Sequence, residues 1–130
     1  MKAAAPSSIT PVLVTYNSAS ILPWSLPALA DCENVVVVDN HSSDDTVAVA
    51  KRLLPQAQVI DAKTNLGFGR ANNLGIAAVT TDYALLLNPD ARLDPGALQG
   101  LVDAAQRYPE AAIVAPVLYD APGVVGDFFR

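Results

Sequence analysis

The 130-residue sequence has a single cysteine, Cys32, and no long apolar run. One cysteine excludes an internal disulfide and a metal site built from several cysteines, so nothing indicates an oxidising compartment. No stretch approaches the ~18 consecutive apolar residues of a transmembrane helix, and residues 1–8 lack the apolar core of a signal peptide. We therefore expect a cytoplasmic protein, with peripheral attachment to a membrane as the alternative location.

Charged residues are also scarce, at 16% of the chain, and the 8 lysines and arginines are scattered along it. Proteins that bind nucleic acid usually concentrate basic residues on one face, so we expect no nucleic-acid partner. The hydrophobic fraction is 52%, and its excess is mostly alanine and valine. This size and composition suit one core, so we expect a single domain over residues 1–130, with 1–8 disordered and 119–130 a tail of undefined packing.

Short runs of valine, isoleucine and leucine alternate with segments of helical period. This pattern predicts an α/β fold with a Rossmann-like, doubly wound, mostly parallel sheet flanked by helices. We expect strands at residues 9–15, 35–39, 58–61 and 83–87, and a weaker fifth strand at 112–118. Because Pro11 lacks an N–H donor, the first strand has an alternative start near Val12.

Helices are expected between these strands, at residues 20–29, 44–54, 69–79 and 95–105. Pro23 is tolerated in the first turn of the first helix, and Pro55 ends the second. Ser43 is the predicted N-cap of the second helix, followed by two acidic residues that suit the positive end of its dipole. Asp94 and Pro95 have the pattern of an N-cap and a first-position proline for the fourth helix.

Polar residues collect where four of the expected strands end. In an open parallel sheet, ligands bind at the carboxyl ends of the strands, where loops leave polar groups free. The residues in question are Thr15, Tyr16 and Asn17, then Asp39, Asn40 and His41, then Asn65, and finally Asn88, Pro89 and Asp90. Four separate segments should therefore meet at one rim and form a ligand site.

These segments carry four motifs that resemble those of family 2 glycosyltransferases with the GT-A fold, in particular the rhamnosyltransferase-like enzymes of cell-surface polysaccharide synthesis. The motifs are Val14-Thr15-Tyr16-Asn17, Val36 to Asn40 followed by Ser42-Ser43-Asp44, Asn65 to Gly75, and Leu86 to Asp90. Each motif alone is weak, but their order and spacing over residues 9–118 make the resemblance specific.

The resemblance implies transfer of a sugar, with inversion, from a UDP- or dTDP-sugar to a saccharide or lipid-linked acceptor. It implies that this chain is the donor-binding half, in which Thr15 and Tyr16 pack on the nucleoside, Asp39 hydrogen-bonds it, and the segment 65–73 closes over the nucleotide. The nucleotide-binding residues expected on this basis are Thr15, Tyr16, Asn17, Asp39, Asn65, Gly67, Arg70, Asn73, Asn88 and Asp90.

The resemblance also implies a divalent cation, magnesium or manganese, because Asp90 matches the last acid of the family's D-x-D metal motif. The sequence departs from the family pattern at Asn88, where many members have aspartate, and at Asn72, where a good number have arginine. A diphosphate beside Asp39 and Asp90 is repelled unless a cation lies between them. Since Asn88 is neutral, we expect weak metal binding in the absence of nucleotide.

The residues after Asp90 include no segment that resembles the family's catalytic-base motif, so no catalytic residue is assigned. Only 40 residues follow Asp90. We therefore expect a truncated chain, a natural fragment or a donor-binding module. Loss of a second half would expose a sheet edge or an apolar patch, so we expect a homodimer, or exchange of the segment 116–130 between copies.

Other interpretations remain open from the sequence. Asn88-Pro89-Asp90 is also a good turn sequence, Asp39 also suits a loop cap, and Tyr16 also suits ordinary packing. Asp39 at a strand end also resembles the phosphoacceptor of a receiver-type signalling module, but such a module needs acidic residues where Thr15 and Tyr16 stand. A nucleotidyltransferase needs a glycine-rich, basic loop after the first strand, and residues 14–20 form no such loop.

Overall fold

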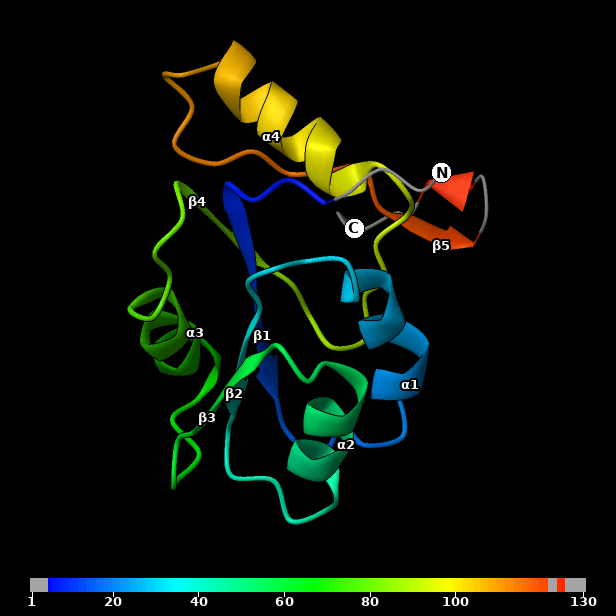
Figure 1. Cartoon of the computed structure of the whole chain (residues 1–130), viewed down its shortest axis with the longest axis vertical. Coiled ribbons are helices and arrows are strands. Elements are labelled where there is room, and N and C mark those ends of the chain that lie inside the picture. Colours follow the sequence, from blue (N-terminus) through cyan, green and yellow to red (C-terminus); the bar gives the residue numbers. More distant parts are fainter. Residues whose placement is uncertain (1–4, 122–123, 126–130) are drawn as a thin grey trace.

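The computed structural model describes residues 5–121 and 124–125, and its centre is a four-stranded parallel sheet with helices on both faces (Figure 1). The elements are β1 (Ile9–Thr15), α1 (Leu22–Ser25), the 3-10 helix η1 (Leu26–Leu29), β2 (Val36–Asp39), α2 (Thr46–Leu53), β3 (Gln58–Asp61), α3 (Phe68–Ile76), β4 (Tyr83–Leu86), α4 (Ala97–Arg107), β5 (Tyr119–Ala121) and β6 (Val124–Val125). The strand order is β3-β2-β1-β4. The predicted α/β, doubly wound fold is confirmed.

Two hydrophobic layers hold the helices on the sheet, because side chains alternate between its faces. Leu13 and Val37 join α1, η1, α2 and α4 in the larger cluster, whereas Val12 and Val38 pack beneath α3. Helix α3 lies so close to the sheet that a Cβ atom added at Gly75 would lie 2.5 Å from Cγ1 of Val12. Glycine at this position therefore sets how closely α3 packs.

Strand β1 begins at Ile9 and includes Pro11, so the alternative start near Val12 is wrong. Pairing of β1 with β2 begins only at Val12, opposite Val36. On the other side of β1, the Tyr83 N–H donates to the carbonyl of Ser8 and the Leu87 N–H to that of Val12. Along β1, the backbone groups of successive residues point alternately toward β4 and toward β2, so the nitrogen of Pro11 points toward the β2 side. At the level of Pro11, β2 has not yet begun. No ladder hydrogen bond is lost there.

Several helix boundaries differ from the predictions, and α3 ends at Ile76 rather than at residue 79. Residues 20–29 form a short α-helix and a 3-10 helix, because Pro27 lacks the N–H that a continuous α-helix needs. The N-cap of α2 is Asp45 rather than Ser43. The N-cap of α4 is Gly96, with φ of 82°, rather than Asp94. Glycine adopts this left-handed conformation without a steric cost, which moves the helix start past Pro95.

The predicted fifth strand at residues 112–118 is wrong. The segment has no regular secondary structure, and β5 and β6 form a separate antiparallel pair beyond it. Its apolar composition is typical of a strand, but a strand is stable only beside a partner, and no described strand pairs with this segment.

The predictions of a disordered segment 1–8 and of a tail 119–130 lie partly outside the described residues, since residues 1–4, 122–123 and 126–130 are not described. Within the described part, Ala5 packs against the larger core cluster and the Ser8 carbonyl accepts a hydrogen bond from Tyr83. None of the described helices has the length and apolar character needed to cross a bilayer.

Candidate functional site

The carboxyl ends of the parallel strands form one rim, at the lower end of the sheet in Figure 1. Register places Thr15, Asp39 and Asp61 abreast on β1, β2 and β3. On the other side of β1, Leu86 lies opposite Val12, so the chain beyond it reaches the level of Thr15. Asp39 ends β2 and Asp90 follows β4, both at the same end of the sheet. Only β1 lies between these two strands, so they are two strand spacings of about 4.8 Å apart.

Asp39 lies inside the protein, with 3% of its surface exposed. Its Oδ1 accepts hydrogen bonds from the hydroxyls of Thr15, at 3.0 Å, and Ser42, at 2.6 Å, and its Oδ2 accepts one from the Ser42 N–H, at 2.9 Å. These three donors compensate the burial of the carboxylate. Asp39 thus holds the loop after β2 against β1, and its buried carboxylate is poorly placed to act as a phosphoacceptor.

The loops after β1 and β2 hold each other through polar contacts, and we call residues 15–19 and 39–46 the interlocked loops. Further bonds run from the N–H of Asn17 to Ser42 Oγ (2.9 Å), from the N–H of Ser43 to Asn17 Oδ1 (2.8 Å), from the N–H of Ser18 to Thr46 Oγ1 (2.8 Å), and from the N–H of Ala19 to Asp44 Oδ2 (3.2 Å). The hydrogen bond from the Thr46 hydroxyl is the main reason that the pKa of Asp44 is lowered. Backbone and side chains together therefore fix the shape of this part of the rim.

A second set of contacts ties β2 to the start of α3. Asn40 Nδ2 donates to Asn65 Oδ1 at 3.0 Å, and the N–H groups of Leu66 and Gly67 donate to Asn40 Oδ1 and Asn65 Oδ1, at 2.7 and 2.9 Å. Gly67 has φ of 77°, so it turns the chain into α3 where other residues would be strained. Asn65 and Gly67 thus shape the entry to α3, and Arg70 lies exposed in its first turn.

Three strands of the sheet are followed by a residue in the left-handed conformation, always two positions after the strand ends. These residues are Asn17, His41 and Lys63, with φ of 48°, 70° and 63°. Such conformations are uncommon for residues other than glycine and concentrate at functional sites. Sequence reasoning missed this feature. Only Asn17 and His41 carried a signal, since asparagine and histidine tolerate this region best.

The loop after β4 is open, and we call residues 88–91 the open loop. Its backbone forms a turn, in which the Ala91 N–H donates to the Asn88 carbonyl at 3.0 Å. Asn88-Pro89-Asp90 is therefore a turn sequence, as one interpretation had it, and it also lies at the rim. Asn88 and Asp90 are exposed, and no described residue donates a hydrogen bond to the Asp90 carboxylate or forms an ion pair with it. Two oxygen-bearing side chains are therefore available to a ligand.

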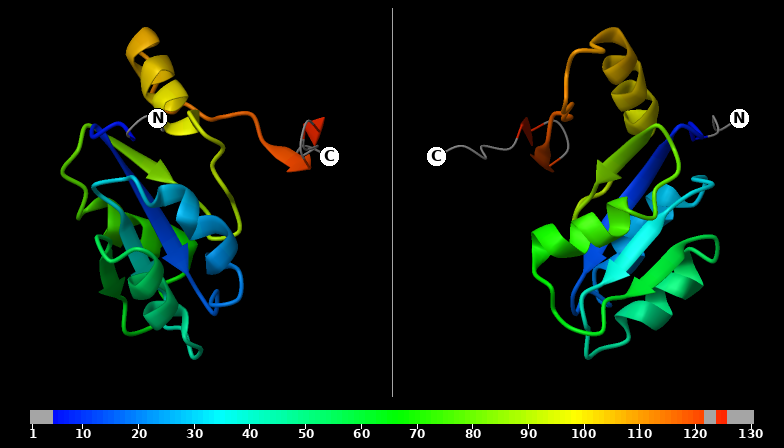
Figure 2. Two further views of the ribbon diagram at one scale, coloured as in Figure 1. Left: turned by 45° about the vertical axis from the view of Figure 1, so that its right-hand side comes forward. Right: turned by 90° about the vertical axis from the view of Figure 1, so that its left-hand side faces the viewer.

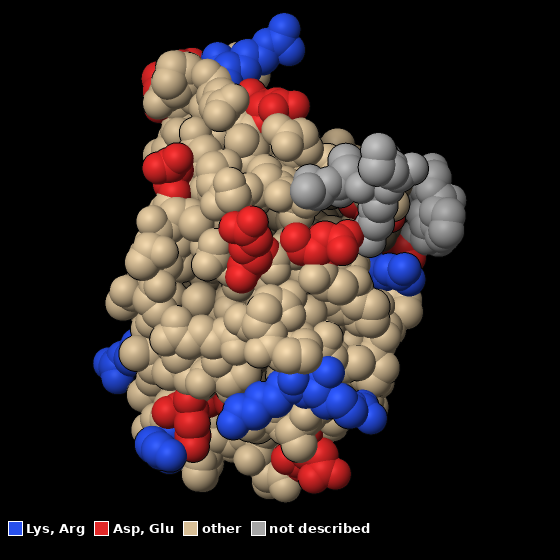
Figure 3. Space-filling view, in the orientation of Figure 1, with Lys and Arg blue, Asp and Glu red and all other residues tan. Residues whose placement is uncertain are grey.

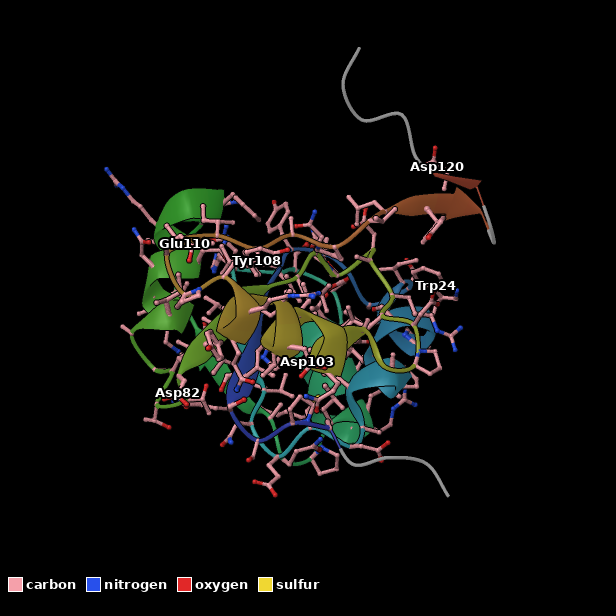
Figure 4. All side chains as sticks on the ribbon, turned by 90° about the horizontal axis from the view of Figure 1, so that it is seen from above. Trp24, Asp82, Asp103, Tyr108, Glu110 and Asp120 are labelled. Atoms are coloured by element: carbon pink, nitrogen blue, oxygen red, sulfur yellow. The ribbon has the colours of Figure 1, made fainter. Side chains whose placement is uncertain are left out.

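Contacts on its far side anchor the open loop. The Arg92 guanidinium lies 6.0 Å from the ring centre of Trp24 on α1, a cation–π distance, and Leu93 packs against the larger core cluster. Figure 4 shows Trp24 at the margin of the protein beside α1. These contacts fix one end of the loop, and the hydrogen bond from the Leu87 N–H to the Val12 carbonyl fixes the other, while Asp90 stays accessible.

The oxygen ligands of the open loop suit a hard divalent cation. Among the described residues, no group of three or more His, Cys, Asp or Glu side chains is placed to hold a metal. One carboxylate from Asp90 and one amide oxygen from Asn88 form an incomplete ligand set, which fits magnesium or manganese that takes its remaining ligands from phosphate and water.

The other predicted residues differ in accessibility. Tyr16 is 54% exposed at the rim, whereas Asn73 lies in the second turn of α3, farther from the strand ends. On the face drawn in Figure 3, a short band of basic side chains crosses the lower part, with acidic side chains beside and below it. The rim thus has an exposed aromatic side chain.

Two hollows of the surface lie away from the rim. One of about 300 Å³ lies at the amino end of the sheet, beside Thr10 and Gln58. Another, apolar and about 620 Å³ in volume, runs along β4. Neither is lined by any of the predicted nucleotide-binding residues. We place the candidate site at the rim because the polar groups gather there, on an open shelf rather than in a closed pocket.

Comparison with protein families matches residues 11–127 to the model "Glycosyl transferase family 2". An N-acetylglucosaminyl-diphospho-decaprenol L-rhamnosyltransferase of Mycobacterium tuberculosis is 31% identical in an alignment 129 positions long, which covers 88% of this chain and 42% of the relative. An uncharacterized glycosyltransferase of Mycobacterium bovis is 37% identical over 98 residues, 75% of this chain and 44% of the relative. The chain thus spans less than half the length of these relatives.

Solved structures share the fold. S. aureus TarS superposes with a TM-score of 0.68 at 21% identity, covering 88% of this chain and 24% of TarS. TarS 1–349 in complex with UDP gives a TM-score of 0.64 at 27% identity, over 79% and 32% of the two chains. The mannosyltransferase PcManGT of Pyrobaculum calidifontis, in complex with GDP-Man and Mn2+, gives 0.70 at 22% identity, over 75% and 32%.

Proposed function

The chain belongs to glycosyl transferase family 2, and we propose that its rim binds the nucleoside diphosphate part of a sugar donor. One observation carries the proposal: the interlocked loops and the open loop lie side by side at the carboxyl end of one parallel sheet. In such sheets this end is the usual ligand position. The 27% identical TarS fragment was solved with UDP, which supports a nucleotide as the ligand class.

In the proposed complex, the two parts of the rim hold different parts of the donor. Tyr16, exposed after β1, offers its ring to the base, and Asp39 fixes the loops around the nucleoside. Asp39 Oδ2 accepts a single internal bond and keeps a second lone pair for a nucleoside N–H. The diphosphate then lies over β1 toward the open loop, with Arg70 as a nearby positive charge.

A magnesium or manganese ion is the proposed cofactor, held by Asp90 with help from Asn88. When bound, such an ion neutralises charge on the diphosphate as it departs from the sugar. The relative PcManGT was solved with GDP-Man and Mn2+, which supports a cation of this class. Asp90 supplies the only charged oxygen of the open loop, so we expect metal and nucleotide to bind together rather than separately.

The reaction that we propose is transfer, with inversion, from a UDP- or dTDP-sugar to a saccharide or lipid-linked acceptor in cell-surface polysaccharide synthesis. The name of the M. tuberculosis relative includes a diphospho-decaprenol, which supports a lipid-linked acceptor. We assign donor binding to this chain and assign the general base to no residue of it.

Titration calorimetry with UDP, dTDP and GDP, each with and without Mn2+, tests the proposed ligand. We expect heat of binding for UDP or dTDP in the presence of Mn2+ and much weaker binding without it. AMP serves as a control that lacks the diphosphate. Absence of binding for every diphosphate in both conditions would overturn the proposal.

A further inference from the structure

Two acids at the rim are each followed, two positions later, by a basic residue. After β3, Lys63 Nζ lies 2.8 Å from Asp61 Oδ2, and the two side chains form an ion pair. After β4, Arg92 has the same spacing from Asp90, but these two described residues form no ion pair with each other. The same spacing in the sequence therefore leads to two different arrangements of the side chains.

The side chain of Trp24 accounts for the difference. The Arg92 guanidinium lies 6.0 Å from the ring centre of Trp24, a distance at which the face of the ring attracts a cation. Figure 1 and the left view of Figure 2 show how the contact arises, since the segment between β4 and α4 passes beside α1, which carries Trp24. Arg92 is thus held at α1 rather than at Asp90.

The two arrangements open to Arg92 are close in free energy. Trp24 is 49% exposed and Arg92 is exposed as well, and in such surroundings a cation–π contact and an ion pair are both weak and of similar strength. An arginine side chain is longer than that of lysine, so it can span the two-residue spacing that Lys63 spans. Without the ring, Arg92 would therefore be free to pair with Asp90.

The position of Trp24 depends on the other part of the rim. Helix α1 comes shortly after the interlocked loops, and the N–H groups of Ile21 and Leu22 donate to the carbonyl of Ser18, at 3.0 and 3.2 Å. Leu22 is fully buried in the larger core cluster. The ring is thus carried by an element that the core and the interlocked loops both hold in place.

We propose that Trp24 is a positioning residue for Asp90, the proposed metal ligand: by holding Arg92 over its ring, it leaves the Asp90 carboxylate free for the cation. An arginine paired with Asp90 would neutralise the charge that attracts the metal and would occupy the oxygens that coordinate it. Trp24 acts through Arg92 alone. The metal role of Trp24 rests on the proposed function of the rim, whereas the competition between the ring and Asp90 for Arg92 does not.

Carboxyl-carbon NMR of the ligand-free 130-residue chain at neutral pH tests this competition. Trp24→Ala should shift the Asp90 carboxyl signal, because Arg92 then pairs with it, and adding Arg92→Gln should return the signal to its position in the parent. Tyr108→Ala is the matched control, since it removes a 53% exposed aromatic side chain elsewhere, and it should leave the signal unchanged. An unshifted signal in Trp24→Ala, or a shift that persists when Arg92 is also replaced, would overturn the proposal.

Titration calorimetry with UDP measures the consequence for the metal, as the ratio of the affinities with and without Mn2+. This ratio should fall about threefold in Trp24→Ala, because an exposed ion pair is only weakly favourable. It should stay near the parent value in Trp24→Phe, which keeps an aromatic ring, and recover in Trp24→Ala/Arg92→Gln. A loss of stability alone would not be reversed by the second substitution.

Two results of the calorimetry would count against the inference in different ways. A ratio that is unchanged in Trp24→Ala, or that stays low in Trp24→Ala/Arg92→Gln, would contradict the role of Trp24 while the proposed function stands. If the parent binds no diphosphate in either condition, the proposed function fails and the metal role of Trp24 fails with it. The NMR result still decides whether the Trp24 ring keeps Arg92 away from Asp90.

Discussion

The two parts of the rim differ in how their carboxylates are used. In the interlocked loops, Asp39 is 3% exposed and accepts three internal hydrogen bonds. In the open loop, Asp90 is exposed and no described residue bonds to its carboxylate. The internally bonded acid stabilises the fold and keeps one lone pair for the nucleoside, whereas the exposed acid has its whole carboxylate available to a ligand. The same residue type, at the same end of the same sheet, is therefore expected to have two separable roles.

The largest effect that separates the two acids should be on stability. Asp39→Ala removes the acceptor of the Thr15 and Ser42 donors and should lower the free energy of unfolding by about 3 kcal/mol. Asp90→Ala removes no internal contact and should change it by less than about 0.5 kcal/mol. Urea denaturation of both variants measures this difference. Similar losses of stability in the two variants would abolish the distinction between the two parts of the rim.

Ligand affinity should reveal the role of Asp90, which stability does not. Asp90→Ala should weaken the binding of UDP or dTDP in the presence of Mn2+ by at least about tenfold, which corresponds to about 1.4 kcal/mol, because the metal loses its charged protein ligand. Asp82→Ala is the matched control, since Asp82 is an exposed acid at the opposite end of β4. Calorimetry should find parent-like affinity in that variant. Equal affinities in all three proteins would remove Asp90 from the site.

A smaller effect should follow from loosening the interlocked loops. Asn17→Ala removes the oxygen that accepts from Ser43 and places alanine at a φ of 48°, so the free energy of unfolding should fall by about 1–2 kcal/mol. Asn17→Gly relieves the backbone strain and should recover part of that loss. Asn73→Ala, at an exposed position of α3, should not destabilise the protein. If thermal unfolding gives the same midpoint for all three variants, the loops are not braced through Asn17.

The smallest expected effect is the pH dependence that Asp44 contributes. Hydrogen bonds, first from Thr46, hold the pKa of Asp44 below its ordinary value of 3.8 in the folded protein. A depressed pKa adds stability that is complete above the unfolded value and is lost as the pH falls through the folded value. The stability difference between the parent and Asp44→Asn should therefore be constant from neutral pH down to about pH 4.5 and shrink in stronger acid. A difference that grows in acid would have the wrong sign.

Much of the sheet could be predicted because its strands are short and strongly apolar. The range 9–15 agrees with β1, because a buried parallel strand leaves a nearly continuous apolar run. The range 58–61 agrees with β3, whose apolar residues are the half-buried Val59 and Ile60. The helix starts were less accurate, since Ser43 and Asp94 looked like caps in isolation. In the folded chain Ser43 bonds to Asn17, a residue distant in sequence, and Gly96 turns the chain instead of Asp94.

The candidate site was foreseen as a set of strand ends but not as two different parts. Strand periodicity places Asp39 and Asp90 at one end of a parallel sheet. It does not reveal that the hydroxyls of Ser42 and Thr15 donate hydrogen bonds to the Asp39 carboxylate, because these bonds depend on the conformation of the loops after β1 and β2. The close approach of α3 at Gly75 also escaped prediction, since it depends on Val12 and Val38 from separate strands.

The central claim is that metal and nucleotide bind together at the rim. Paramagnetic NMR with Mn2+ tests this claim most directly. With UDP or dTDP present, we predict that substoichiometric Mn2+ broadens the amide signals of Asn88, Asp90 and Ala91 first. Those of Tyr16 and Asn17 should follow, while the signal of Gln99 on α4 stays sharp. Broadening that is centred on another group of acids, or that is the same with and without nucleotide, would contradict the account.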